Sequence, residues 1–477
     1  MNNKLVALLI LVWLFTSFGD ADALRQAQER PIRLAQDKPN IVFIMADDMG
    51  MECLSSYGSA TYQTPNLDRL AANGVRFEHC YSTPLCTPSR VQVMTGLYNF
   101  NNYLDFGTLR LDQTTFANLL KDQGYATCIA GKWQLGGDAS TMAHFGFDQH
   151  CVSHLGGITP EQNSIAKGRY AHPQIQQNGR YLPDEVIRDA YGPDIFCDFI
   201  IDFIEENQNK PFFAYYPMVL VHSPFGPTPD SEEWKEQTKR DDKDVRYFKE
   251  MVAYADKLVG RIFHKIEELE LSENTLIVFT GDNGTHPTIS SEMTNGSTIH
   301  GGKGTMPDAG THVPLIVSWK GVSPTGVILK DLVDFSDFLP TFLDASGKKY
   351  VTKHNLDGRS FLAPIRGEVG SPRHWAFCHY DPNFQVGGFQ LHAGRWARDQ
   401  QFKLYEDGHF YDVANDPLEK HAIQSPGSVV GAFPAKEKLR EVLQSMPPWV
   451  ELGEPHRHSE QNKKYISKLV EAGNIEL

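Results

Sequence analysis

Apolar runs of strand length alternate with helical patterns along most of the chain. Several runs contain almost no polar position, which is typical of strands that are covered on both faces. Between them, apolar residues recur at the spacing of an amphipathic helix. This alternation predicts an α/β fold in which helices sandwich a mostly parallel sheet. The strand runs are 40–46, 126–130, 212–221, 275–280 and 313–318, and the helical patterns are 64–74, 116–124, 194–207, 244–270 and 335–343.

The pattern changes in the last quarter of the chain, where short strand runs are separated by turn residues. Such closely spaced strands pair antiparallel. We therefore predict a large domain at 24–371 and a smaller C-terminal α+β subdomain at 372–477, built from an antiparallel sheet and one helix. The short strand runs are 389–391, 402–405 and 410–413, and the helical pattern is 435–446.

Residues 1–23 have the pattern of a secretory signal peptide. Lys4 supplies a positive start, residues 5–15 are almost wholly apolar, and residues 21–23 are small enough for a cleavage site after Ala23. This apolar stretch is too short for a membrane anchor, and no later stretch approaches a spanning length. The sequence therefore predicts an exported protein, periplasmic or secreted, without stable membrane insertion.

Charge and cysteine content narrow the function further. The 477 residues carry a formal net charge of −14, which disfavours binding to nucleic acid or to anionic membranes. An anionic substrate would need a local basic pocket to overcome this charge. The chain has seven cysteines, so one is left over in an oxidising compartment even if all the others pair.

Polar residues follow three of the predicted strands. The carboxyl ends of parallel strands meet at one edge of a sheet, where ligands bind. Oxygen donors of this kind suit Ca²⁺ or Mg²⁺ better than zinc. Taken singly, each pair could also be an ordinary polar strand end or turn. Together they predict a metal site, and its candidate residues are Asp47, Asp48, Asp282 and Asn283, with His222 beside them.

Residues 84–96 (PLCTPSRVQVMTG) place Cys86 at the start of a predicted helix, with Pro88 in its first turn. An anion held there would meet free backbone amides and the positive end of the helix dipole. Taken alone, the short pattern Cys-x-Pro-x-Arg is also compatible with a buried or disulfide-bonded cysteine.

The surrounding motifs resemble those of the type I sulfatase family, in the alkaline phosphatase superfamily. Residues 84–96 match the signature in which such sulfatases convert a cysteine to formylglycine. Residues 124–133 match a second signature, Gly-Tyr-x-Thr-x-x-x-Gly-Lys-Trp, and residues 301–305 are similar to a later lysine motif. The resemblance extends from about Lys38 into the C-terminal subdomain. It implies an alkaline-phosphatase-like core and a sulfuric ester hydrolase.

This resemblance also implies the cofactors. Cys86 would become formylglycine through a maturation enzyme, and the hydrated aldehyde would be the nucleophile. Six cysteines then remain that could pair. Ca²⁺ is favoured over Mg²⁺, and its ligands would be Asp47, Asp48, Asp282 and Asn283.

The same resemblance assigns roles to four further residues. Arg90 would hold the formylglycine. Lys132 and Lys303 would neutralise the sulfate, and His222 would protonate or orient the departing alcohol. Each of these roles suits a reaction in which a stable anion loses a poor leaving group, because such a site needs positive charge and a proton donor.

One departure from the family pattern affects catalysis. The second signature usually continues with histidine, whereas this chain has Gln134. That histidine would act as a base that helps to release sulfate, and an amide cannot take up a proton. Another imidazole (His154, His286 or His300) or a water could replace it, or turnover could be weak. We predict an active enzyme with an altered proton route.

The substrate is expected to be a sulfated carbohydrate, because of the predicted export and the activity of most of the family. Two other functions stay open: a formylglycine-dependent phosphodiester or phosphonate monoester hydrolase, and a sulfated-glycan-binding protein with little or no turnover. The sugar, the sulfate position and the oligomeric state stay open as well. Candidate substrate contacts are Gln134, His300, Asp308 and His312.

Overall fold

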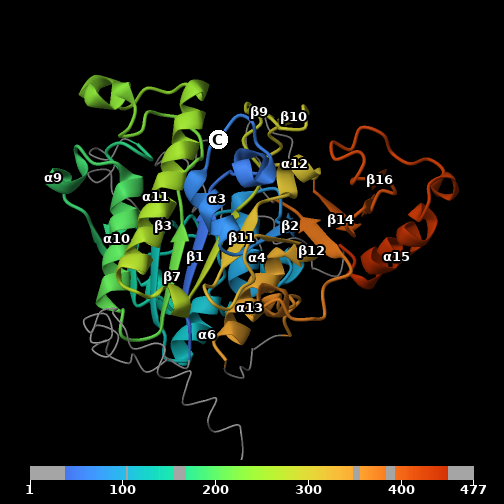
Figure 1. Cartoon of the computed structure of the whole chain (residues 1–477), viewed down its shortest axis with the longest axis horizontal. Helices are drawn as coiled ribbons and strands as arrows, with labels where there is room; N and C mark the ends of the chain where they lie inside the picture. Colours follow the sequence, from blue (N-terminus) through green and yellow to red (C-terminus); the bar gives the residue numbers. More distant parts are fainter. Residues whose placement is uncertain are drawn as a thin grey trace, which may run out of the picture. The chain divides into compact units, whose positions relative to one another are not determined.

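A ten-stranded sheet forms the frame of the fold (Figure 1). The computed structural model describes residues 38–449, apart from 104–105, 139, 154–167, 348–354 and 383–392. The predicted signal peptide, the predicted strand at 389–391 and His154 therefore lie outside the described residues. The strand order is β12-β2-β11-β8-β1-β7-β3-β4-β5-β6.

Most pairings in this sheet are parallel, as the sequence predicts. β1 lies between β7 and β8 and is parallel to both, and β3 is parallel to β7 and β4. β11, β5 and β6 pair antiparallel with their neighbours, whereas β12 is parallel to β2. The strands are β1 (Asn40–Ala46), β2 (Val75–Tyr81), β3 (Ala126–Lys132), β4 (Gln149–Ser153), β5 (Gln176–Gln177), β6 (Arg180–Tyr181), β7 (Phe212–Pro217), β8 (Thr275–Gly281), β11 (Leu315–Ser318) and β12 (Val327–Asp334).

Helices cover both faces of the sheet (Figure 1). Alternate residues of β1 point to opposite faces: Val42 and Ile44 belong to the buried cluster with α3, α10 and α11, and Ile41 and Phe43 to the cluster with α4, α6 and α13. Burial of β1 on both sides explains its continuous apolar run. The longer helices are α3 (Pro65–Ala72), α4 (Cys86–Thr95), α6 (Phe116–Asp122), α10 (Gly192–Glu206), α11 (Phe248–Glu268) and α13 (Phe338–Ala345).

No helix within the described ranges is both long enough and apolar enough to cross a membrane.

Short helices lie in the segments that connect the strands and the longer helices. The short α-helices are α5 (Asn99–Asn102), α7 (Thr141–His144), α9 (Asp184–Ile187), α12 (Asp308–Thr311) and α14 (Leu362–Ile365). The 3₁₀ turns are η1 (Met51–Cys53), η2 (Ser55–Tyr57), η3 (Glu232–Lys235), η4 (Gln237–Lys239), η5 (Val245–Tyr247), η6 (Ser272–Asn274), η7 (Phe335–Asp337) and η8 (Pro426–Ser428).

Strand β7 ends at Pro217, four residues before the predicted end at Val221. The chain beyond Pro217 still follows β1, but it bonds to the residue after that strand: Asp47 donates its N–H to the carbonyl of Leu220 at 2.7 Å, and Val221 donates to the carbonyl of Asp47 at 2.7 Å. These two hydrogen bonds hold the segment after β7 against the end of β1, and His222 therefore lies there.

A separate antiparallel sheet, in the order β13-β14-β15-β16, confirms the predicted C-terminal α+β architecture. One face packs on α15, and the other shares a buried cluster with Cys86 and Tyr81 of the large domain. The position of the domain boundary stays a prediction. The elements are β13 (Ala376–Tyr380), β14 (Gly394–Arg398), β15 (Phe402–Tyr405), β16 (Phe410–Asp412) and α15 (Ala432–Ser445), and a hairpin in the large domain is formed by β9 (Ser290–Glu292) and β10 (Thr298–His300).

All seven cysteines lie in the described part of the chain, and each is a buried free thiol. The six that remain beside Cys86 are therefore not paired as disulfides.

A buried ion-pair cluster joins the small sheet to α12. Arg398 donates through Nη1 to both carboxylate oxygens of Asp308, at 2.8 and 2.7 Å. Lys403 Nζ lies 3.3 Å from the same carboxylate and 2.7 Å from Glu419. His312 directs Nε2 at the carbonyl of Glu78, 2.9 Å away. Asp308 and His312 were expected to contact substrate, but the structure gives both side chains partners within the protein.

We expect Asp308→Asn to lower the free energy of unfolding by about 3–5 kcal/mol at pH 7, because it leaves two buried cations short of a partner. Burial opposes ionisation of Asp308, but Arg398 and Lys403 hold its pKa below the ordinary value. The stabilisation is therefore complete above the unfolded pKa of about 3.9 and is lost as the pH falls through the lower folded pKa. Urea unfolding across this range tests the prediction. Asp122 is exposed, so the control Asp122→Asn should change the free energy of unfolding by less than about 0.5 kcal/mol. A difference between wild type and Asp308→Asn that does not depend on pH would contradict the prediction.

Candidate active site

Polar residues from the ends of β1 and β8 meet at one edge of the sheet. β1 and β8 pair in register up to Ala46 and Gly281, so the residues that follow each strand are neighbours. Asp48 accepts a hydrogen bond from Asn283 Nδ2 at 2.9 Å, and its own N–H donates to Asp282 Oδ1 at 2.9 Å. Both aspartates after β1, Asp282 and Asn283 are completely buried. The structure thus brings together the four side chains that the sequence suggested as metal ligands.

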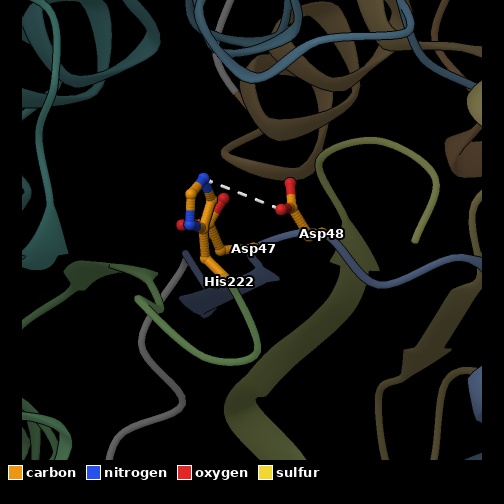
Figure 2. A group of neighbouring side chains, drawn as sticks. All are labelled: Asp47, Asp48 and His222. Atoms are coloured by element: carbon orange, nitrogen blue, oxygen red, sulfur yellow. Dashed lines mark ion pairs between the residues drawn. The ribbon is translucent and has the colours of Figure 1, made fainter. Parts of the chain in front are cut away.

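His222 reaches the same place from the segment after β7. Figure 2 shows its imidazole beside Asp47 and facing Asp48. Ligand atoms of these three side chains lie within 4.8 Å of one another. Its Nε2 is 3.6 Å from Asp48 Oδ2 and 2.9 Å from Lys303 Nζ, and its Nδ1 is 2.5 Å from the carbonyl of Ser223. Nδ1 must donate to that carbonyl, so Nε2 accepts a hydrogen bond from Lys303 Nζ.

The donor set fits a hard cation such as Ca²⁺. Asn283 Oδ1 is buried and accepts no hydrogen bond, and Asp47 Oδ2 accepts none either, although Lys132 Nζ lies 2.8 Å from it as an ion-pair partner. A buried oxygen without a partner is costly, and a cation would supply the missing interaction. Burial and the negative charge of Asp47 raise the pKa of Asp282 to about 7, although Arg90 lowers it. The carboxylates therefore repel one another, and a divalent cation would relieve that repulsion.

Cationic side chains face each carboxylate. Lys132 Nζ donates to Asp47 Oδ1 at 2.8 Å, and Lys303 Nζ donates to Asp48 Oδ2 at 2.7 Å. Arg90 binds Asp282 Oδ2 through Nη2 at 2.8 Å and through Nε at 3.1 Å. Burial opposes the charge of Asp47, but Lys132, His222 and the two nearby arginines hold its pKa well below the usual value. The site therefore concentrates positive charge around ionised oxygens.

Local backbone geometry positions Lys132 at the end of β3. The preceding residue, Gly131, has a φ of +126°, and a Cβ there would lie 1.9 Å from the carbonyl oxygen of Pro217. Only glycine allows β3 and β7 to approach this closely. Lys132 also accepts a hydrogen bond from Arg90 Nη1 on its carbonyl, at 3.3 Å, which ties β3 to α4.

Cys86 is the first residue of α4, as the sequence predicts, and its side chain is buried. The N–H of Gly304 donates to the carbonyl of Pro84 at 2.8 Å, which holds the loop of Lys303 against the segment before Cys86. Burial raises the pKa of the Cys86 thiol, although Lys132 and Lys303 lower it in part. The unmodified thiol is therefore neutral at pH 7 and a poor nucleophile.

Gln134 lies against Cys86: the thiol donates to Gln134 Oε1 at 3.2 Å. Its backbone has a φ of +51°, in the left-handed region. The two other candidate bases within the described residues, His286 and His300, are bonded elsewhere. His300 is exposed on β10 with Nδ1 2.8 Å from Ser290 Oγ, and His286 Nδ1 is 2.9 Å from Thr288 Oγ1. Gln134 is thus the side chain placed to act on whatever group residue 86 carries.

Arg169 also lies at the site, although the sequence does not indicate it. Its Nη1 is 3.8 Å from Asp47 Oδ2, and its side chain is 14% exposed. It belongs to no strand end and to no recognised motif, so nothing in the sequence pattern indicated its place.

A mostly parallel α/β sheet with carboxylates, lysines and a helix-initiating cysteine at one edge is the arrangement that the sequence resemblance predicts for a sulfatase. A family model described as Sulfatase matches residues 39–348, and the chain belongs to the sulfatase family. It is a sulfuric ester hydrolase. The chain is 30% identical to an arylsulfatase of Hemicentrotus pulcherrimus over 410 residues, which cover 80% of this chain and 72% of that protein. It is 29% identical to human arylsulfatase A over 460 residues, covering 86% of each chain.

Solved structures confirm the fold. The crystal structure of Ps i-CgsB in complex with k-i-k-neocarrahexaose superposes with a TM-score of 0.70 and 24% identity, covering 90% of this chain and 97% of that one. A phosphonate monoester hydrolase of Agrobacterium radiobacter superposes with a TM-score of 0.61 and 22% identity, covering 86% of this chain and 95% of that one.

Proposed function

We propose that this sulfatase is an exported, periplasmic or secreted enzyme that removes sulfate from a carbohydrate, with a formylglycine made from Cys86 and a bound Ca²⁺. The observation that carries the proposal is the position of Cys86. It begins a helix, it is buried against Gln134, and it is tied through Pro84 to the loop of Lys303. A maturation enzyme would have to act on this cysteine before the chain folds, because the folded protein buries it.

Asp47, Asp48, Asp282 and Asn283 would hold the Ca²⁺, which would supply positive charge for a sulfate oxygen. A hydrated aldehyde at position 86 would supply two hydroxyl groups: one could attack sulfur as the alcohol leaves, and loss of the proton of the other would release sulfate and restore the aldehyde.

The protein's own side chains would do the rest. Lys132 and Lys303 carry the charge that neutralises sulfate oxygens, and Arg90 keeps α4 fixed to Asp282 and to β3. His222 Nε2 accepts a hydrogen bond from Lys303 in the resting structure, so this pair can deliver a proton to the departing alcohol oxygen. Gln134 can orient a hydroxyl of residue 86 but cannot take its proton.

A carbohydrate substrate is supported by proteins of the same fold. One was solved with k-i-k-neocarrahexaose, and another with its substrate D-glucosamine-2-N,6-O-disulfate. Sulfate released from sulfated galactans, fucans, glycosaminoglycans and aryl sulfates tests this proposal, with phosphate diesters and phosphonate monoesters assayed in parallel. Faster hydrolysis of the phosphorus esters than of every sulfate ester would contradict it.

Calcium should stabilise the folded protein. After treatment with a chelator, Ca²⁺ at 100 times its dissociation constant should add about 2.7 kcal/mol and raise the melting temperature. Asp48→Asn should abolish most of this shift, because it removes a charged ligand. Glu52→Gln is the matched control, since Glu52 is also a buried acid near this loop but belongs to no ligand set. A shift with a transition metal and none with Ca²⁺ would contradict the metal assignment.

A further inference from the structure

Arg169 is a cation at the active site that has no part in the chemistry proposed above. Its Nη1 is buried and donates no hydrogen bond. Among the described residues, its ion-pair partner is Asp47, whose Oδ2 lies 3.8 Å away, beyond hydrogen-bond distance. Lys132 already donates to that carboxylate at 2.8 Å. Arg169 is therefore held at the site without a full partner of its own.

The position of Arg169 is fixed by its neighbour. The hydroxyl of Tyr170 donates to the carbonyl of Val219 at 3.1 Å and also bonds the carbonyl of His222. The carbonyl of Tyr170 accepts from Gly192 N–H at 2.8 Å, at the start of α10. Tyr170 thus fastens the backbone next to Arg169 to the turn that carries His222. Burial lowers the pKa of His222 and the charge of Arg169 lowers it further, so the guanidinium lies near the imidazole that is proposed to meet the departing alcohol.

Arg169 is one cation more than the carboxylates of the active site require. The three carboxylates Asp47, Asp48 and Asp282 each have a closer cation, at 2.8, 2.7 and 2.8 Å. A largely buried cation without a full partner is costly, and the cost is recovered when an anion binds it. Guanidinium groups also match the planar oxygens of carboxylate and the oxygen pairs of sulfate.

We propose that Arg169 binds a second anionic group of the substrate, a sulfate or a carboxylate on the leaving-group side of the reacting sulfate. The inference rests on the proposed function. It narrows the substrate to glycans that carry at least two anionic groups close together, either polysulfated sugars or sulfated sugars beside a uronic acid. A neutral sugar on the leaving-group side would leave the guanidinium unpaired.

The test compares pairs of substrates that differ in one charge. A disulfated disaccharide is paired with its monosulfated form, and a uronate-containing sulfated disaccharide with its carboxyl-reduced form. For each pair, the ratio of kcat/KM for the doubly charged over the singly charged member is measured in the wild type, Arg169→Gln and Arg169→Lys. We expect Arg169→Gln to lower this ratio about 10- to 100-fold, mainly through KM, for the pair whose second group is recognised. Arg169→Lys should lower it less, because it keeps the charge and loses only the planar fork.

The substrate pair whose kcat/KM ratio falls in Arg169→Gln identifies the second anionic group as sulfate or as carboxylate. Melting temperatures establish that both variants are folded. An unchanged ratio for both pairs would overturn the inference, because Arg169 would then act on the reacting sulfate or only through Asp47. Failure of the wild type to release sulfate from any member would overturn the proposed function, and this inference with it.

Discussion

Cys86→Ala should release sulfate about 10⁴-fold more slowly than the matured wild type, on every substrate that the enzyme accepts. Alanine cannot be converted to an aldehyde, so the group that attacks sulfur is lost while the surrounding cations remain. Cys86→Ser tests the same claim more narrowly, because serine keeps one hydroxyl but not two on the same carbon. We expect it to be as inactive in turnover as the alanine variant. Initial rates of sulfate release, measured by ion chromatography, check both.

Cys378→Ala is the matched control for this loss. Cys378 is a buried free thiol in the same buried cluster as Cys86. Its substitution should cost some stability through a small cavity but leave kcat within about 3-fold, because it has no role in the chemistry. Equal losses in the two variants would attribute the effect to packing and contradict the assignment of Cys86.

Gln134→His should raise kcat by about 10²-fold, because it adds a general base where the wild type has only an amide. The position is suitable: Gln134 Oε1 already contacts the side chain of residue 86, at 3.2 Å. Its φ of +51° is one that histidine tolerates better than most residues. Since only the neutral imidazole accepts a proton, the gain should appear as the pH rises through about 6.5.

Gln134→Asn is the control for this gain. Asparagine also tolerates the left-handed backbone and keeps an amide, so it should give no increase at any pH. The full pH profile of kcat for the three proteins is the measurement. A gain in both variants would point to relief of crowding at Cys86, and a pH-independent gain in the histidine variant would contradict the role of general base.

Much of the fold could be predicted from the apolar runs alone. β1 and β15 have the predicted bounds, and β8 differs by one residue, because these segments carry the pattern of buried or half-buried strands. β2 (VRFEHCY) and β14 (GRWAR) were missed because charged residues interrupt them. The two arginines of β14 are nevertheless buried, since Arg398 has the carboxylate of Asp308 and Arg395 has the ring of His379. Partners that come from distant parts of the chain cannot be read from a local pattern.

The same distinction applies to the site. The residues that follow β1 and β8 could be placed together because parallel strands in register end at the same edge of the sheet. The position of Cys86 could be predicted because the sequence indicates that a helix begins there. Arg169 could not be predicted, because its place depends on a tyrosine hydroxyl that bonds carbonyls some fifty residues away. The sequence makes Asp308 a candidate substrate contact, but its ion pairs with Arg398 and Lys403 could not be predicted, because both partners come from the C-terminal sheet. A role that depends on ion pairs between distant parts of the chain can be recognised only from the structure.

The central claim is that residue 86 acts as formylglycine, and mass spectrometry of the tryptic peptide that contains it tests this directly. The protein should be purified from a host that matures such cysteines, assayed for sulfate release, and digested after labelling with a reagent for aldehydes. We predict that the peptide carries the mass of an aldehyde in place of the thiol, and that the labelled fraction rises in proportion to specific activity. An intact Cys86 thiol in a preparation that releases sulfate at its full rate would contradict the account.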